Sequence, residues 1–196
     1  MASVSVTHVT PEEYLEFERR SAVKHEYRDG EIVEMPGSSY AHDCLAGNLL
    51  RSLFQTLARE KYGVHTSDLR IKVSETGLYT YVDASVVIGE AVLEGDHGDL
   101  LLNPAVIFEI LSPSTEPYDR GDKFASYRTI ESLTDYVLIS QDKQRVECYS
   151  REPGDAEWSY RAYDGPEPTV ELTSIGCSLK LSELYYKVPL SGAASG

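Results

Sequence analysis

The chain lacks long hydrophobic runs and has few cysteines. No stretch of about 18 apolar residues occurs in its 196 residues, which argues against a membrane-spanning helix. Its three cysteines, Cys44, Cys148 and Cys177, are odd in number and far apart. Such spacing suits neither a disulfide framework nor a zinc site, so we interpret them as small core residues of a protein in a reducing compartment.

Other familiar signals are missing as well. Residues 1–8 have neither the basic start nor the apolar middle of a secretion signal, which favours a cytoplasmic location. We find no internal repeat, no glycine-rich phosphate loop and no Ser-His-Asp arrangement that can be placed. These absences argue against repeat architectures, phosphate-loop proteins and triad hydrolases.

The chain has fewer basic residues than acidic ones. Lysine and arginine total 18 against 32 aspartates and glutamates, which gives a formal net charge of -14. A protein that grips nucleic acid through its phosphates normally presents a basic face. Acidic metal ligands would account for only part of the excess, and much of the rest lies in residues 12–18, 90–99 and 152–171. Tight non-specific DNA binding by a free monomer is therefore disfavoured.

The remaining composition is that of an ordinary globular protein, with 41% hydrophobic and 26% charged residues. A length of 196 residues is enough for one well-cored domain and gives little reason to propose two. We expect a single domain over residues 1–190. The small-residue segment 191–196 is expected to be a disordered tail.

Local patterns predict a mixture of helices and strands. Thr10-Pro11-Glu12-Glu13 has the residues of a capped helix start. Residues 24–35 predict a hairpin with its turn at Asp29-Gly30. A long helix is expected from about 40 to 62, because leucines recur every four residues from Leu45 to Leu57.

Further elements follow from the same kind of pattern. Strands are expected at 69–73, 135–140, 145–149, 158–163 and 169–172, and a helical turn at 181–185. In the strand at 69–73, Arg70 and Lys72 are expected to point outward, as a solvated sheet face in preference to a phosphate contact. Residues 90–99 are acidic and glycine-bearing, and we expect a surface loop there.

Two carboxylates interrupt strongly β-prone runs. Asp83 lies within the run 79–88, and Glu109 lies within the run 105–111, where it shares a strand face with Ile107 and Leu111. An unpaired charge inside a buried strand is costly, so we expect Asp83 at a strand end, paired or bound to a metal.

A helix expected over 118–130 places Lys123 and Tyr127 on one side. Two acidic residues from neighbouring strands, with a lysine close by, are what a hydrolytic site around a hard divalent cation requires. A lysine whose ammonium group reaches solvent along the edge of an apolar face is the alternative for Lys123.

Glu26 and His42 are weaker candidates. Alternation in the hairpin puts Glu26 on a face with Val33 and Met35, so it is either a sheet-surface carboxylate or part of a site. His42 lies near the edge of the apolar stripe of the long helix, where it is either a structural or surface histidine or a member of a cleft.

Together these stretches resemble the Uma2 family of restriction-endonuclease-like proteins, also catalogued as domain of unknown function 820. The resemblance runs from about Thr10 to Glu183. The stretches that carry it are Glu26 in His-Glu-Tyr-Arg-Asp-Gly-Glu-Ile-Val, His42 at the start of the long helix, Asp83 in Tyr-Val-Asp-Ala-Ser-Val-Val, Glu109 in Ile-Phe-Glu-Ile-Leu-Ser-Pro-Ser-Thr, Lys123 in Tyr-Asp-Arg-Gly-Asp-Lys, and Tyr127.

The resemblance implies an α/β (α+β) fold with a PD-(D/E)xK nuclease core, in which a mixed central β-sheet is flanked by helices. Three positions depart from the pattern: Val82 stands where the motif has proline, Leu111 where it has lysine, and Val137 where tryptophan is expected. Since the motif's lysine is missing from the strand, the resemblance makes Lys123 on the following helix its substitute.

The implied activity is metal-dependent endonuclease cleavage of DNA. In this interpretation Asp83, Glu109 and the backbone carbonyl of Ile110 hold Mg²⁺ or Mn²⁺. Lys123 orients the attacking water or stabilises the transition state, and Glu26 supports the water shell of the metal or a second ion. His42 is a candidate proton shuttle.

Two alternatives stay open at this point. A nuclease fold without catalytic activity could serve as a nucleic-acid-binding or assembly module. Paired carboxylates also occur in glycosidases, although a lysine on the helix that follows the strand does not suit that chemistry. A homodimer would suit a nuclease that cuts both strands.

Overall fold

The central element of the fold is a six-stranded mixed sheet. The computed structural model describes residues 8–95 and 97–190. The strand order is β12-β11-β10-β9-β6-β3, in which β9 and β10 are parallel and the other neighbours are antiparallel. The strands are β3 (Tyr62–Thr66), β6 (Ala84–Ile88), β9 (Val106–Leu111), β10 (Asp135–Ser140), β11 (Arg145–Ser150) and β12 (Ser159–Asp164).

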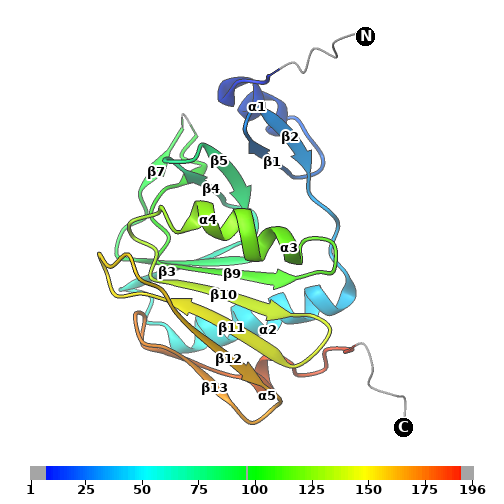
Figure 1. Cartoon of the computed structure of the whole chain (residues 1–196), viewed down its shortest axis with the longest axis vertical. Helices are drawn as coiled ribbons and strands as arrows, with labels where there is room; N and C mark the ends of the chain where they lie inside the picture. The colour runs from blue at the N-terminus through cyan, green and yellow to red at the C-terminus, as the bar shows by residue number, and fades with distance from the viewer. Residues whose placement is uncertain (1–7, 96, 191–196) are drawn as a thin grey trace.

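One face of this sheet is covered by the long helix α2 (Tyr40–Thr56), with α5 (Leu181–Leu184) nearby (Figure 1). Ser39 caps α2 by accepting a hydrogen bond from the backbone N–H of His42. Leu45, Leu49 and Leu53 are fully buried against the sheet, because a spacing of four residues keeps them on one side of the helix. The hairpin of β13 (Thr169–Leu172) and β14 (Cys177–Lys180) completes this layer.

The opposite face is covered by an irregular helical segment. It consists of α3 (Glu116–Tyr118), the π-helical turn η1 (Asp119–Lys123) and α4 (Phe124–Tyr127). In Figure 1 this segment lies between the central sheet and the strands of a second sheet. The buried side chains of Tyr127 and Ile130 connect the two sheets, since they pack with residues of both.

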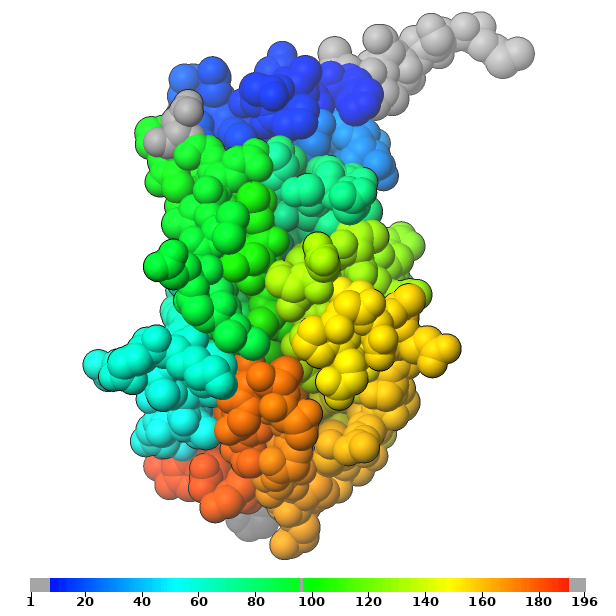
Figure 2. All heavy atoms as spheres, turned by 90° about the vertical axis from the view of Figure 1, so that its left-hand side faces the viewer, coloured from blue at the N-terminus to red at the C-terminus, as the bar shows by residue number. Residues whose placement is uncertain are grey.

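The second sheet is built from strands that lie between residues 25 and 101, in the order β2-β1-β5-β4-β8-β7. Its strands are β1 (His25–Arg28), β2 (Glu31–Glu34), β4 (Arg70–Val73), β5 (Leu78–Tyr81), β7 (Leu93–Glu94) and β8 (Leu100–Leu101). Helix α1 (Pro11–Glu18) packs on it through Tyr14, whose ring contacts those of Tyr27 and Tyr79. Figure 2 shows these N-terminal residues gathered at one end of the molecule.

Several sequence-based expectations are confirmed. The α+β architecture has a mixed sheet with helices on both faces. Thr10 and Glu13 form the expected capping box. In the hairpin, Glu26 pairs with Val33, and the turn residues Asp29 and Gly30 have φ of 49° and 82°, as a two-residue turn with both φ values positive requires.

Other expectations were wrong. Helix α2 ends at Thr56 instead of about residue 62, because residues 62–66 pair with β6 as an edge strand. That pairing outweighs the helix preference of the charged residues just before it. The predicted helix 118–130 ends at Tyr127. Strand β14 was not predicted, and the expected tail 191–196 lies outside the described residues.

The expectation for residues 70–99 also needs correction. Arg70 is buried and pairs with Asp99, while Lys72 pairs with Glu94. Both carboxylates come from the segment that we expected to be a surface loop, which instead contains β7 and leads into β8. None of the helices in the described part of the chain has the length and apolar character to cross a membrane.

A buried carboxylate ties the π-helical turn to the central sheet. Glu147 on β11 is 5% exposed and receives hydrogen bonds from Arg120 of η1, from Tyr160 and from Arg145. Burial by itself favours the protonated form, but these three donors outweigh it and lower the pKa of Glu147 to about 2. The ionised carboxylate therefore stabilises the fold.

We predict that Glu147→Gln flattens the acid limb of the stability profile. Because the folded pKa lies below the ordinary value, the stabilisation is present above the unfolded pKa and is lost as pH falls toward 2. The variant should lose roughly 3 kcal/mol at pH 7 and much less near pH 2. Urea unfolding at several pH values measures this. The exposed Glu157→Gln is the control, and a loss at pH 7 that persists undiminished at pH 2 contradicts the prediction.

Candidate active site

Asp83 marks the point where the chain passes from one sheet to the other. The run predicted as a single strand over 79–88 is divided into β5 and β6, with Val82 and Asp83 between them. The backbone N–H of Asp83 donates to the carbonyl of Phe108 at 3.2 Å, and its Oδ2 accepts from the N–H of Ile110 at 2.6 Å. Asp83 therefore lies at a strand end directly beside Glu109, as the sequence predicted.

Glu109 points from β9 toward the π-helical turn and α4. It shares the buried face that contains Ile107 and Leu111, as strand alternation predicted. Its Oε1 accepts a hydrogen bond from the hydroxyl of Tyr127 at 3.0 Å and lies 2.9 Å from the ammonium of Lys123. Glu109, which interrupts the apolar run 105–111, is thus paired inside the molecule.

Lys123 is the centre of the cluster and is only 3% exposed. Its Nζ lies 2.9 Å from Glu109, 3.2 Å from Glu26 and 3.6 Å from Asp119. It ends a π-helical turn, a local widening of the helix that recurs at functional sites. The alternative in which this ammonium reaches solvent is wrong.

Glu26 belongs to this cluster and is not a sheet-surface carboxylate. It is 5% exposed, and its Oε1 accepts a hydrogen bond from the hydroxyl of Thr80 on the neighbouring strand β5. The same oxygen faces Lys123. The hairpin therefore contributes one carboxylate to a cluster whose other members come from β9 and the π-helical turn.

His42 approaches Asp83 from the layer formed by α2. Its Nε2 lies 2.9 Å from Oδ1 of Asp83, and the ring is partly exposed. Partial burial by itself lowers the pKa of His42, but the hydrogen bond and negative charge of Asp83 outweigh it and raise the pKa above its ordinary value. His42 is thus a partner of Asp83 and has a path to solvent.

The electrostatics of the cluster are unbalanced. Glu26, Glu109 and Asp119 surround the single ammonium of Lys123, and Asp83 lies close by. Burial is the largest cause that raises the pKa of Glu109 well above its usual range. The charge of Lys123 opposes the shift, and the charges of Asp119 and Asp83 add to it. Burial disfavours the charged form of Lys123, but the carboxylates around it outweigh this effect and raise its pKa. The lysine is firmly charged, and the carboxyl groups around it outnumber it.

Sequence reasoning missed Asp119 and Thr80. Asp119 is buried, and burial is the main reason why its pKa is raised. Its position four residues before Lys123 was the available signal, because that spacing brings side chains together on a helix. Thr80 is fully buried in a β-prone run and carries no comparable signal.

The donor set suits a hard divalent cation in its chemistry and charge. Carboxylate and carbonyl oxygens are the ligands that Mg²⁺ and Mn²⁺ prefer, and the carboxyl groups of the cluster outnumber the single ammonium of Lys123. Lys123 contacts each of these two glutamates, Glu26 and Glu109, through the Oε1 atom. In the described part of the chain, no three His, Cys, Asp or Glu side chains form a group arranged to hold a metal ion.

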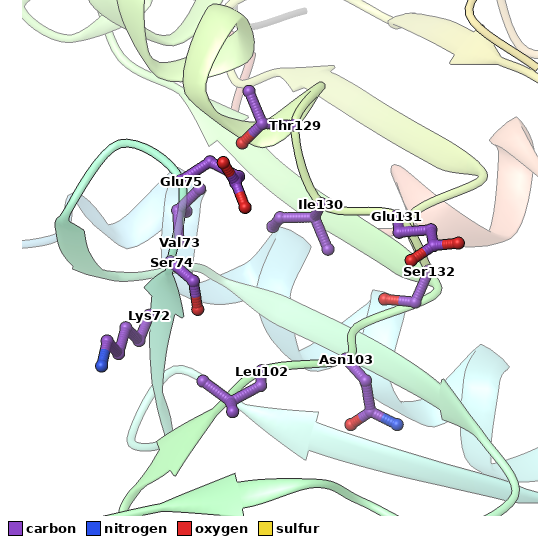
Figure 3. Close-up of a pocket in the computed structure, with 10 residues that line it drawn as sticks. All are labelled: Lys72, Val73, Ser74, Glu75, Leu102, Asn103, Thr129, Ile130, Glu131 and Ser132. Atoms are coloured by element: carbon purple, nitrogen blue, oxygen red, sulfur yellow. The ribbon is translucent and has the colours of Figure 1, made fainter. Parts of the chain in front are cut away.

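A surface hollow lies away from this cluster. It has a volume of about 440 Å³ and opens between β4 and the segment that follows α4 (Figure 3). Its lining includes Lys72, Glu75, Asn103 and Glu131, and none of the predicted site residues. The candidate active site therefore rests on the buried cluster and not on this hollow.

Comparison with solved structures shows a nuclease-like fold. The crystal structure of "a putative nuclease belonging to DUF820" from Anabaena variabilis ATCC 29413 matches with a TM-score of 0.73, covering 90% of this chain and 97% of that one. The identity is 20%, so the likeness concerns the fold alone.

The chain belongs to the Uma2 family, which is described as "Putative restriction endonuclease" and whose sequence model matches residues 11–182. Two relatives from Synechocystis sp. (strain ATCC 27184 / PCC 6803 / Kazusa) are each 34% identical and carry the names "Uncharacterized protein slr1290" and "Uncharacterized protein sll1609". The matches cover 90% and 88% of this chain, and 91% and 98% of the respective relatives. The family resemblance inferred from the sequence is confirmed.

We predict that Lys123→Met strongly destabilises the fold. Removing the ammonium leaves Glu26, Glu109 and Asp119 buried without their shared counter-charge, which should cost roughly 3–5 kcal/mol at neutral pH. The loss should shrink as pH falls, because the carboxyls become neutral. Chemical denaturation at pH 7 and pH 5 provides the measurement.

The matched control for that variant is Lys143→Met, at an exposed lysine in the turn between β10 and β11. Its effect should stay within about 0.5 kcal/mol at both pH values. Equal stability of Lys123→Met and the wild-type chain would contradict the view that Lys123 compensates the buried carboxylates.

Proposed function

We propose that this protein is a metal-dependent endonuclease that hydrolyses phosphodiester bonds in DNA. The observation that carries the proposal is the convergence of Glu26, Glu109 and Lys123, with Asp83 beside Glu109, inside a nuclease-like fold. Membership of a family described as "Putative restriction endonuclease" supports a nucleic-acid substrate, and restriction enzymes act on DNA. We also propose a cytoplasmic homodimer, since two sites would serve two strands.

Asp83, Glu109 and the backbone carbonyl of Ile110 would hold Mg²⁺ or Mn²⁺. When bound, such an ion polarises the phosphate and lowers the pKa of water. Lys123 keeps its positive charge because its pKa is raised, so it can stabilise negative charge on the phosphate or orient the attacking water. Glu26 shares Lys123 with Glu109 and would hold the ammonium, or the water around the ion, when Glu109 turns to the metal.

His42 has a separate role in this proposal. It orients Asp83 through a 2.9 Å contact and, being partly exposed, can pass protons between the site and solvent. Tyr127 similarly restrains Glu109. Both contacts hold carboxylates in place before substrate arrives, which is the function that supporting residues perform around metal ligands.

The direct test is cleavage of supercoiled plasmid DNA with Mg²⁺ or Mn²⁺, with EDTA as the metal-free reference and a structured RNA as the second substrate. Asp83→Asn and Glu109→Gln should each lower the cleavage rate by roughly a thousandfold or more, because each would remove a charged ligand oxygen. Glu157→Gln, on an exposed loop, should leave the rate unchanged. Full activity in either Asp83→Asn or Glu109→Gln would overturn the site assignment.

A milder effect is expected from His42→Asn. Loss of the contact to Asp83 should lower the cleavage rate by roughly 10–100-fold, the range typical for residues that support metal ligands. The melting temperature should change little, because the ring is partly exposed. A rate equal to that of the wild-type chain, at saturating metal, would show that His42 has no part in the reaction.

Two observations favour a second candidate, a nuclease fold without catalysis that serves as a nucleic-acid-binding or assembly module. Lys123 lies among the carboxylates, and no ready metal-holding group exists among the described residues. A calorimetric titration with Mn²⁺ separates the two candidates. Absence of binding with and without DNA supports the module, whereas binding that Glu109→Gln abolishes supports the endonuclease.

A further inference from the structure

Arg28 lies beside the acidic cluster on the same strand as Glu26. The two are separated by one residue on β1, so their side chains leave the same face of the strand. Glu26 reaches Lys123, while the guanidinium of Arg28 lies over the ring of Tyr118, 4.6 Å from its centroid. The Nζ of Lys123 lies 5.9 Å from the same centroid. One ring therefore has both cations close to it.

The ring of Tyr118 also connects Arg28 with the site electrostatically. Tyr118 immediately precedes Asp119 at the start of the π-helical turn. Burial is the largest cause that raises the pKa of Tyr118, to about 12, and the charge of Glu26 adds to it while Lys123 and Arg28 oppose it. The hydroxyl therefore stays protonated at neutral pH, and the ring is a neutral support for the guanidinium.

Arg28 differs from nearby basic residues in having no carboxylate partner among the residues that the structure describes. Lys24, Arg70 and Lys72 each pair with an aspartate or glutamate. Within the described residues, no carboxylate lies within ion-pair distance of Arg28, although Glu31 is its cross-strand neighbour in the hairpin. A half-buried guanidinium that has no ion-pair partner in the described part of the chain is available to an anion.

We propose that Arg28, held on the ring of Tyr118, is a phosphate-binding subsite for the nucleic-acid strand that enters the acidic cluster. This inference rests on the endonuclease proposed above. A chain with a net charge of -14 needs local positive charge where a polyanion approaches its carboxylates. Arginine binds phosphate through two parallel hydrogen bonds, and stacking on an aromatic ring restricts the guanidinium before the ligand arrives.

The test compares Arg28→Gln with Arg51→Gln, which removes the same charge from an exposed position on α2, on the other face of the central sheet. Affinity for a fluorescein-labelled DNA duplex is measured by anisotropy at several salt concentrations, with Glu109→Gln in the background so that cleavage does not interfere. Arg28→Gln should weaken binding roughly tenfold and reduce the slope of log affinity against log salt by about one. Arg51→Gln should change neither.

Two further variants separate a phosphate contact from a structural role. Arg28→Lys keeps the charge but loses the planar fork, so it should retain most of the salt slope with intermediate affinity. Tyr118→Phe keeps the ring and should bind like the reference protein. If the melting curve shows that Arg28→Gln does not fold, these two variants test the proposal in its place. Reduced DNA affinity in Arg28→Lys, with the affinity of Tyr118→Phe unchanged, supports the subsite. Reference affinity in both variants overturns it.

The outcomes also distinguish this inference from the proposed function. If the wild-type chain cleaves DNA and Arg28→Gln matches Arg51→Gln in affinity, salt slope and KM, the phosphate subsite is wrong and the endonuclease stands. If the wild-type chain neither binds nor cleaves DNA or RNA, the proposed function is wrong and this inference is overturned with it. A tenfold rise in KM for Arg28→Gln, with kcat within twofold of the wild-type value, supports both.

Discussion

The ion pairs of Lys123 join three parts of the molecule that are distant in sequence. The ammonium contacts Glu26 from the hairpin, Glu109 from the central sheet and Asp119 from its own π-helical turn. Each carboxylate is buried, so none could remain ionised at low cost without that cation. One charge therefore links the hairpin, the central sheet and the helical segment, in addition to the apolar core that the two sheets share.

Further contacts hold the same helical segment to the central sheet. The turn η1 is π-helical, and Arg120 within it is bound by Glu147 of β11 while Tyr136 of β10 donates to the carbonyl of Asp119. These contacts hold the turn to strands β10 and β11 of the central sheet. Lys123, in the same turn, contacts Glu26 of the hairpin. A π-helical turn changes the direction in which side chains leave the helix, which is consistent with its recurrence near functional sites.

Part of the fold and site could be predicted because their signals are local. The turn at Asp29-Gly30 follows from residues that tolerate positive φ, and Asp83 and Glu109 stand out against apolar neighbours. What could not be predicted depends on contacts between distant segments. Arg70 was expected to be solvated, because nothing near it in the sequence indicates that Asp99 would cover it.

Two further features depend on contacts between distant segments and could not be predicted. They are the strand at 62–66 and the membership of Glu26 in the cluster. Residues 59–61 favour a helix, and only the neighbouring strand β6 explains why the chain changes direction there. The hairpin pattern left open whether Glu26 is a sheet-surface carboxylate or part of a site, since both faces mix polar and apolar residues. Its burial depends on the position of Lys123, which a pattern within the hairpin cannot reveal.

The division of the cluster between the first and second halves of the chain has a consequence for biosynthesis. Glu26 leaves the ribosome early, whereas Asp119 and Lys123 follow only after the strands of the second sheet and three of the six strands of the central sheet. The acidic group cannot close before the hairpin has docked onto the later strands. A nascent or C-terminally truncated chain that ends before the π-helical turn consequently contains Glu26 and Glu109 without the ammonium that pairs with both.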